Sequence, residues 1–282
     1  MKRTILAGIL SLAAGLQGLT AQPQQKKSAP PAAQPAQPQA PADAGPKGPT
    51  AKSKEEQAAI MALNFAQTDP DGTIKAAEEL LTKFSDTEFK EIALLMEANA
   101  YQKKGDAVKA QIYAQRVLEV NPKDFQASLM LGEILVQSTR ENDLDKEEKL
   151  GNSEKYLNQT IENVKTAAKP NPQLTDAQWE DGRKYVIAEA HNGLGLVAMT
   201  RKKYDLSATE FKMAVEGDPQ PAYQVRLASV YQQAGKNDDA IALCDKILAD
   251  PQLHPQIKQV TQSVRAAAMK AKGAPPAEVK KP

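Results

Sequence analysis

The feature that most constrains the fold of this chain is a sequence pattern that occurs twice. QKKGDAVKAQIYAQRVLEVNP occupies residues 102–122, and its counterpart RKKYDLSATEFKMAVEGDP occupies residues 201–219. Each copy places a polar turn ahead of a helical pattern that closes on a proline. Recurrence with a period of about 34 residues is typical of stacked helix pairs, because a single pair cannot bury its apolar face alone. We therefore expect an all-α solenoid of helix-turn-helix repeats.

The composition between the two ends of the chain also favours helices. Ala, Leu, Glu, Lys and Gln are abundant, and the chain has only five phenylalanines and one tryptophan. Thin helical layers pack closely through alanines and leave little room for large rings. Small residues such as Gly132 and Gly195 indicate places where two helices approach closely. No segment predicts a β-strand.

The first 21 residues predict a cleaved secretory signal peptide. Lys2 and Arg3 form a basic start, residues 5–16 are mostly apolar, and Ala21 is a small residue at the cut. The apolar stretch is shorter than the roughly 20 residues of a membrane span. Because the only cysteine is Cys244, a lipid anchor at the cut and an internal disulfide are both excluded. We expect an exported chain, periplasmic or secreted, with no membrane span after cleavage.

Both flanks of the expected folded domain, residues 51–272, are low in large apolar residues. Residues 22–50 consist mainly of Pro, Ala, Gln and Gly and hold 8 of the 19 prolines. Such a segment cannot bury a core and predicts a disordered, extended linker. Residues 273–282 predict a short disordered tail.

Two stretches of the domain carry a common set of landmark residues. The first stretch, 91–124, contains Leu94, Ala98, Tyr101, Gly105, Ala110, Ala114, Val117 and Pro122, and the second contains Leu194, Gly195, Ala198, Tyr204, Phe211, Ala214 and Pro219. This pattern resembles the tetratricopeptide repeat (TPR) family as found in exported bacterial proteins. Glu97 departs from it, because the family prefers Leu there.

The same landmarks divide the domain into units. We expect an opening helix pair at 53–84, hairpins at about 91–124, 125–169, 175–220 and 221–252, and a capping helix at 255–271. Thr175 and Gln178 predict a capping box ahead of a long helix. The charged insertion 139–148 predicts a solvated loop or helix extension on the rim, before a second helix that resumes near Asn152.

No constellation of residues predicts catalysis, a cofactor or a metal site. Residues 67–78 approach a calcium-loop pattern, but Gln67 replaces the leading Asp and Lys75 adds a positive charge. His191 and His254 lie in separate elements without a nearby cysteine. The formal net charge of +1, without a basic face, gives no reason to expect nucleic acid as a partner.

The resemblance implies a partner-binding groove on the concave face, lined by the first helix of each hairpin. Transferred by position, the groove residues are Asn99, Gln102, Lys103, Glu133, Gln137, Asn192, Leu196, Met199, Ser229, Gln232 and Gln233. Most are neutral and polar. The clamp that the family uses for a C-terminal carboxylate is matched only by Asn99, Asn192 and Lys103.

Three classes of function follow from these observations. The leading expectation is a non-catalytic exported scaffold that binds a protein or peptide through the concave face. The second is an accessory subunit of an envelope export or outer-membrane assembly machine, with contacts through the charged insertion and the proline-rich segment. The third, an exported enzyme or carbohydrate-binding protein, would need clustered acids and aromatics on one face.

Overall fold

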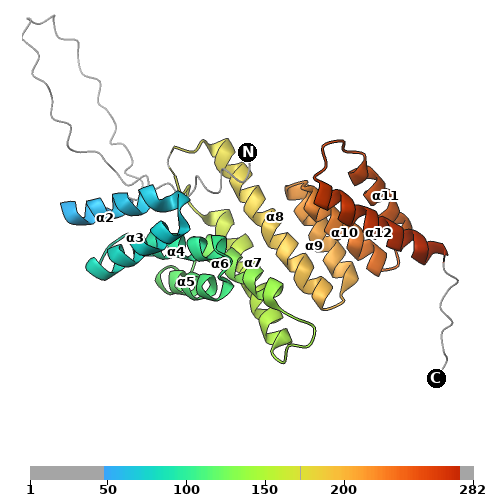
Figure 1. Cartoon of the computed structure of the whole chain (residues 1–282), viewed down its shortest axis with the longest axis horizontal. Helices are drawn as coiled ribbons and strands as arrows, with labels where there is room; N and C mark the ends of the chain where they lie inside the picture. The colour runs from blue at the N-terminus through green and yellow to red at the C-terminus, as the bar shows by residue number, and fades with distance from the viewer. Residues whose placement is uncertain (1–47, 172, 274–282) are drawn as a thin grey trace, which may run out of the picture.

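The computed structural model describes residues 48–171 and 173–273 (Figure 1). Its α-helices are α2 (Lys54–Phe65), α3 (Pro70–Lys83), α4 (Lys90–Lys103), α5 (Ala107–Val120), α6 (Phe125–Ser138), α7 (Lys146–Thr166), α8 (Asp176–Thr200), α9 (Tyr204–Gly217), α10 (Pro221–Gln233), α11 (Asn237–Leu248) and α12 (Pro255–Gly273). A short 3-10 turn, Ala66–Thr68, joins α2 to α3. No strand occurs within the described ranges, so the expected all-α class is confirmed.

The helices stack in chain order along one axis. Helices adjacent in sequence pack against each other, and the first helices α6 and α8 also touch. In Figure 1 the stack runs from α2 and α3 at one end, across the long α8, to α11 and α12 at the other. Buried residues continue through the whole stack, in clusters that each span neighbouring helices. This arrangement is the solenoid expected from the repeats.

Two glycines allow the first and second helices of a hairpin to approach closely. A Cβ on Gly132 would lie 2.6 Å from Leu157, and one on Gly195 would lie 2.7 Å from the Phe211 ring. A serine on each second helix secures the contact: Ser153 Oγ donates to Gly132 O at 2.7 Å, and Ser207 Oγ donates to Gly195 O at 2.8 Å. Ser207 therefore bonds the two helices together.

The turns of three hairpins share one backbone conformation. Gly105 and Gly235 have φ of 76° and 75°, and Lys202 has φ of 60° at the equivalent place between α8 and α9. Each turn closes with a bond from the next amide to a carbonyl five residues back, such as Lys203 N to Ala198 O at 2.9 Å. Positive φ belongs to the left-handed region of backbone conformations, which favours glycine. The backbone of Lys202 is therefore strained relative to that of the two glycines.

The expected capping box of α8 is confirmed. Gln178 N donates to Thr175 Oγ1 at 3.2 Å, and Thr175 N donates to Gln178 Oε1 at 2.9 Å. These two bonds satisfy amide donors that would otherwise be left unpaired at the helix start. The capping box therefore sets where α8 begins.

The charged insertion is shorter and better anchored than its sequence indicates. Helix α7 begins at Lys146 rather than near Asn152, so the loop is confined to residues 139–145. Arg201, at the end of α8, pairs with Glu147 at 3.0 Å and with Glu154 at 2.6 Å. Acidic residues in the first turn of α7 favour the earlier start, because they complement the helix dipole.

Glu97 is buried in the first hairpin after the opening pair. Its side chain on α4 is 0% exposed, and neither carboxyl oxygen has a well-formed hydrogen bond within the described residues. Burial raises its pKa to about 7, although the neighbouring Tyr113 hydroxyl acts in the opposite direction. The departure from the family's Leu therefore places an ionisable group inside the core.

Parts of the predicted domain plan lie outside the described residues. These are the signal peptide 1–21, the linker 22–50 up to residue 47, and the tail from residue 274 onward. Gly273, expected to open the tail, is the last residue of α12.

Candidate functional site

The predicted groove residues lie on the first helices α4, α6, α8 and α10. Those exposed to solvent are Gln102, Lys103, Gln137 and Gln233, and those partly buried are Asn99, Glu133, Leu196, Met199, Ser229 and Gln232. Asn192 is buried. Residues three or four positions apart on a helix share one face, so on each helix these side chains form a row.

Some of these side chains support the fold. Leu196 and Met199 pack on the apolar cluster that contains Phe211. Asn99 Nδ2 donates to Leu95 O at 2.8 Å within its own helix, and Lys103 Nζ donates to Gln67 O at 3.2 Å. The side chains of Gln137 and Gln233 are exposed to solvent, and Gln233 Nε2 donates to Ser229 Oγ at 3.3 Å within its own helix.

The centre of the first-helix face holds a group of polar side chains from three successive hairpins, which we call the Glu133 cluster. Its members are Glu133 on α6, Tyr185, Glu189 and Asn192 on α8, and Tyr223 and Arg226 on α10. Arg226 Nη1 donates a hydrogen bond to Asn192 Oδ1, and Tyr185 Oη donates to Glu189 Oε1 at 2.8 Å.

The three charged members of the cluster reach the surface, while the other members are buried. Glu133, Glu189 and Arg226 are partly exposed. Asn192 and the two tyrosines are buried; Tyr223 is 2% exposed. The charged groups of the cluster therefore reach solvent, while the residues beneath them are largely desolvated. Electrostatic interactions in such surroundings are stronger than in water.

The electrostatics of the cluster are set by two acids and one base. Burial raises the pKa of Glu133 to about 8, with repulsion from Glu189 acting in the same direction, and only Arg226 acts to lower it. Burial, together with the nearby Glu189 charge, also raises the pKa of Tyr223 well above its usual range. Within the cluster, one guanidinium faces two carboxyl groups, and burial keeps the Glu133 carboxyl protonated up to about pH 8.

Sequence reasoning placed Glu133 and Asn192 on this face but missed Glu189, Arg226 and the two tyrosines. The spacing contained a usable signal. Asn192 and Arg226 lie 34 residues apart, and Glu189 and Tyr223 have the same separation. Polar residues at one register in consecutive repeats are expected to meet across neighbouring first helices.

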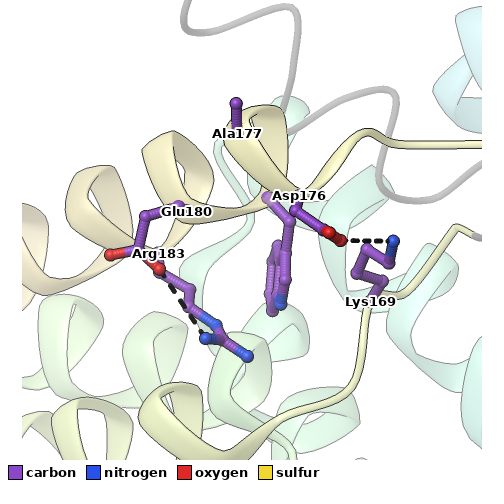
Figure 2. A pocket seen from close by; sticks show the side chains of 6 residues that line it. Lys169, Asp176, Ala177, Glu180 and Arg183 are labelled. Atoms are coloured by element: carbon purple, nitrogen blue, oxygen red, sulfur yellow. Dashed lines mark hydrogen bonds and ion pairs between the residues drawn. The ribbon is translucent and has the colours of Figure 1, made fainter.

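A separate pocket of about 510 Å³ lies at the start of α8, lined by Lys169, Asp176, Ala177, Trp179, Glu180 and Arg183. Figure 2 shows two charge pairs on opposite sides of it, Lys169 with Asp176 and Arg183 with Glu180. Lys169 Nζ lies 2.8 Å from Asp176 Oδ1, and the Arg183 guanidinium stacks 5.0 Å from the centre of the Trp179 ring. The lining charges are thus already paired within the chain.

The histidines and the cysteine provide no catalytic arrangement within the described residues. His191 Nδ1 lies 2.8 Å from Glu210 Oε2 and joins α8 to α9, and Cys244 is buried. Across residues 48–171 and 173–273, no three His, Cys, Asp or Glu side chains gather closely enough to hold a metal ion. None of the helices in this part of the chain is both long and apolar enough to span a membrane.

Comparison with known proteins supports the resemblance argued from the repeats. Residues 95–155 match the model of the tetratricopeptide repeat family. This region extends from α4 into α7 and includes Gly105 and Pro122, which are among the landmarks of the pattern. No curated protein matches the chain in sequence.

Several solved structures are similar to this chain. The MamA protein is 17% identical, with 71% of this chain and 96% of that chain covered and a TM-score of 0.52. A thermophilic TPR protein of Thermus thermophilus is 22% identical, with 74% and 98% covered and a TM-score of 0.47. A tetratricopeptide repeat protein of Parabacteroides merdae is 14% identical, with 78% and 93% covered and a TM-score of 0.44.

Proposed function

We propose that the chain is an exported, non-catalytic scaffold that binds a protein or an extended peptide across its first-helix face. The tetratricopeptide fold is that of a protein-interaction scaffold. The observation that carries the proposal is the Glu133 cluster, which joins α6, α8 and α10 into one partly exposed polar surface. A surface built from three hairpins suits a ligand that extends along the stack.

Two exposed glutamines lie on the same helices as members of the cluster and supply positions for a test. Gln137 on α6 and Gln233 on α10 face solvent on first helices, whereas Gln115 is exposed on the second helix α5. A photo-crosslinking amino acid at each position would be introduced into the full chain in cells that naturally produce it. We expect a common crosslinked protein from positions 137 and 233 and none from position 115.

The pattern of crosslinks decides between faces of the stack. Equal crosslinking from position 115, or crosslinks from that position alone, would contradict binding across the first-helix face. The three substitutions replace exposed glutamines and leave the buried landmarks intact, so unfolding does not explain a difference among them.

Export is supported by the basic start, apolar stretch and small residue of residues 1–21. Mass spectrometry of the chain isolated from its natural cells tests this part directly. We expect a mature N-terminus at Gln22 in the envelope or medium fraction. An intact Met1 in the cytoplasmic fraction would contradict export and leave the scaffold function to be judged on the crosslinks.

One observation favours a second candidate, an accessory subunit of an envelope machine that makes contacts through the insertion. Leu144, at the tip of the 139–145 loop, has a fully exposed side chain between Asp143 and Asp145. A crosslinking residue at position 144 that captures the partner when position 137 does not would favour this candidate.

A further inference from the structure

We infer that the Glu133 cluster recognises a basic side chain, Lys or Arg, of the partner peptide. The inference rests on the proposed function and specifies its ligand chemistry. The expected charge is opposite to that of a C-terminal carboxylate clamp, which needs several cationic groups in the groove. Only Arg226 of the cluster is cationic, and Lys103 on the same face donates to the Gln67 carbonyl.

The cluster has room for one more cation. Glu133, with a pKa of about 8, holds its proton near pH 7, and once it ionises Glu133 and Glu189 carry two negative charges against the single positive charge of Arg226. The Arg226 guanidinium donates to the neutral Asn192 amide. Within the described part of the chain, neither glutamate forms an ion pair with it. A cation from outside the chain would favour the ionised form of Glu133 and compensate its charge, in a site where burial makes uncompensated charge costly.

The hydrogen-bonding groups of the cluster are also incompletely used. Among the described residues, Glu133 has no direct hydrogen-bond partner, so in its ionised form both of its oxygens can accept bonds from a ligand. The Tyr223 hydroxyl is buried beside Glu189 without a well-formed hydrogen bond in this part of the structure. A lysine ammonium has three donors and an arginine guanidinium has five, which matches this surplus of acceptors.

The position of the acids makes the site accessible to a ligand. Glu133 and Glu189 are partly exposed on the first-helix face, whereas Glu97 on α4 is 0% exposed. The rings of Tyr185 and Tyr223 are buried beside the acids and offer an apolar base for the stem of a long basic side chain. The Glu133 cluster therefore combines acidic groups, unused hydrogen-bond acceptors and access for a ligand.

Peptide selection tests this inference on the full mature chain. Random dodecapeptides displayed on phage would be selected for binding to the wild-type protein. Peptides would be kept if they compete with one another for the surface around Gln137 and Gln233. We expect one basic residue to be shared among these binders. Replacing it by citrulline or norleucine should weaken binding by about tenfold or more, because a charge-assisted hydrogen bond is lost.

Matched protein variants locate the contact. Glu133→Gln and Glu189→Gln should each weaken binding of the basic peptide. Neither change should alter the affinity for the version of the peptide that carries norleucine. Glu119→Gln, an exposed acid on the second helix α5, should affect neither. Circular dichroism confirms that each variant is folded, and the norleucine peptide shows that the rest of the surface still binds.

The outcomes separate this inference from the proposed function. Binders that compete at the first-helix face but share no basic residue would overturn the inference and leave the scaffold standing. The same conclusion would follow if Glu133→Gln and Glu119→Gln behaved alike. Failure to select any peptide that competes at this face, together with absent crosslinks at positions 137 and 233, would overturn both.

Discussion

Arg226 donates a hydrogen bond to Asn192, the residue that lies 34 positions before it in the chain. The bond joins equivalent places on the first helices of two consecutive hairpins. Ion pairs with the same separation join Lys52 to Asp86 and Lys272 to Asp238 at the two ends of the stack. Because such contacts repeat at the period of the solenoid, they align each hairpin with the next.

Removing Arg226 should make Glu133 still harder to ionise. Among the described residues, Arg226 is the one charge that lowers the pKa of Glu133, while burial and Glu189 raise it to about 8. In Arg226→Gln we expect the pKa of Glu133 to rise above about 8, as followed by NMR of the side-chain carboxyl carbon. Lys246→Gln, an exposed change on α11, is the control and should leave it unchanged. An unaltered pKa in Arg226→Gln would show that the two residues are not electrostatically coupled.

Glu97 should make the protein less stable as the pH rises. Its pKa is about 7 in the folded chain against an ordinary value of 4.5. The folded state therefore holds a proton that the unfolded chain releases, so the free energy of unfolding falls from about pH 4.5 to about pH 7.

Glu97→Leu removes this ionisation and should stabilise the protein by about 1–3 kcal/mol at pH 8, with a smaller gain at pH 5. Urea unfolding at the two pH values measures the difference. A gain that is equal at both would mean that the benefit comes from packing alone.

Gly195 should not tolerate a side chain. A Cβ there would lie 2.7 Å from the ring of Phe211, which is fully buried. Gly195→Leu should lower the free energy of unfolding by about 1–3 kcal/mol or more through overpacking. Gly151→Ala is the matched control, because nothing lies within 4 Å of the added carbon, and it should stabilise α7 by up to about 1 kcal/mol. Equal tolerance at both glycines would contradict the close helix contact.

Lys202→Gly should stabilise the protein. Lys202 has φ of 60° where Gly105 and Gly235 occupy the equivalent turns. Relief of this strain is worth about 1 kcal/mol, and the exposed ion pair with Glu141 that is lost contributes little. Thermal unfolding of the variant measures the gain, with Lys203→Gly as the control, since that residue has no such conformation. A loss of stability in Lys202→Gly would show that its contacts outweigh the strain.

Arg201→Gln should release the insertion without unfolding the stack. Arg201 pairs with Glu147 and Glu154, which hold the start of α7 against the end of α8. We expect faster hydrogen exchange in residues 139–148 and a change of less than about 1 kcal/mol in overall stability. Unchanged exchange in this segment would mean that the ion pairs do not restrain it.

Much of the architecture could be predicted because its signals are local. The apolar periodicity identified the helices, and Gly195 and Gly132 were identified as sites of close approach, which the neighbouring Phe211 and Leu157 confirm. The start of α7 was misplaced, because its first turns are as polar as a loop. Only the ion pairs with Arg201 and the acids of the first turn explain why that segment is helical.

The candidate site was predicted less completely. Position in the repeat placed Glu133 and Asn192 on first helices, and they lie on α6 and α8. Glu189 and Arg226 were not identified, because each is an ordinary surface residue when its own helix is considered alone. Their importance depends on how closely α6, α8 and α10 approach one another.

The sequence by itself determined that this chain forms paired helices with a repeating register, because helix periodicity, turn glycines and closing prolines act over a few neighbouring residues. Only the tertiary structure decided which polar groups meet. Stacking brings Glu133, Glu189 and Arg226 together from three hairpins, and the burial that results raises the pKa of Glu133. Desolvation and charge–charge interactions depend on distances in space, which separation along the chain does not specify.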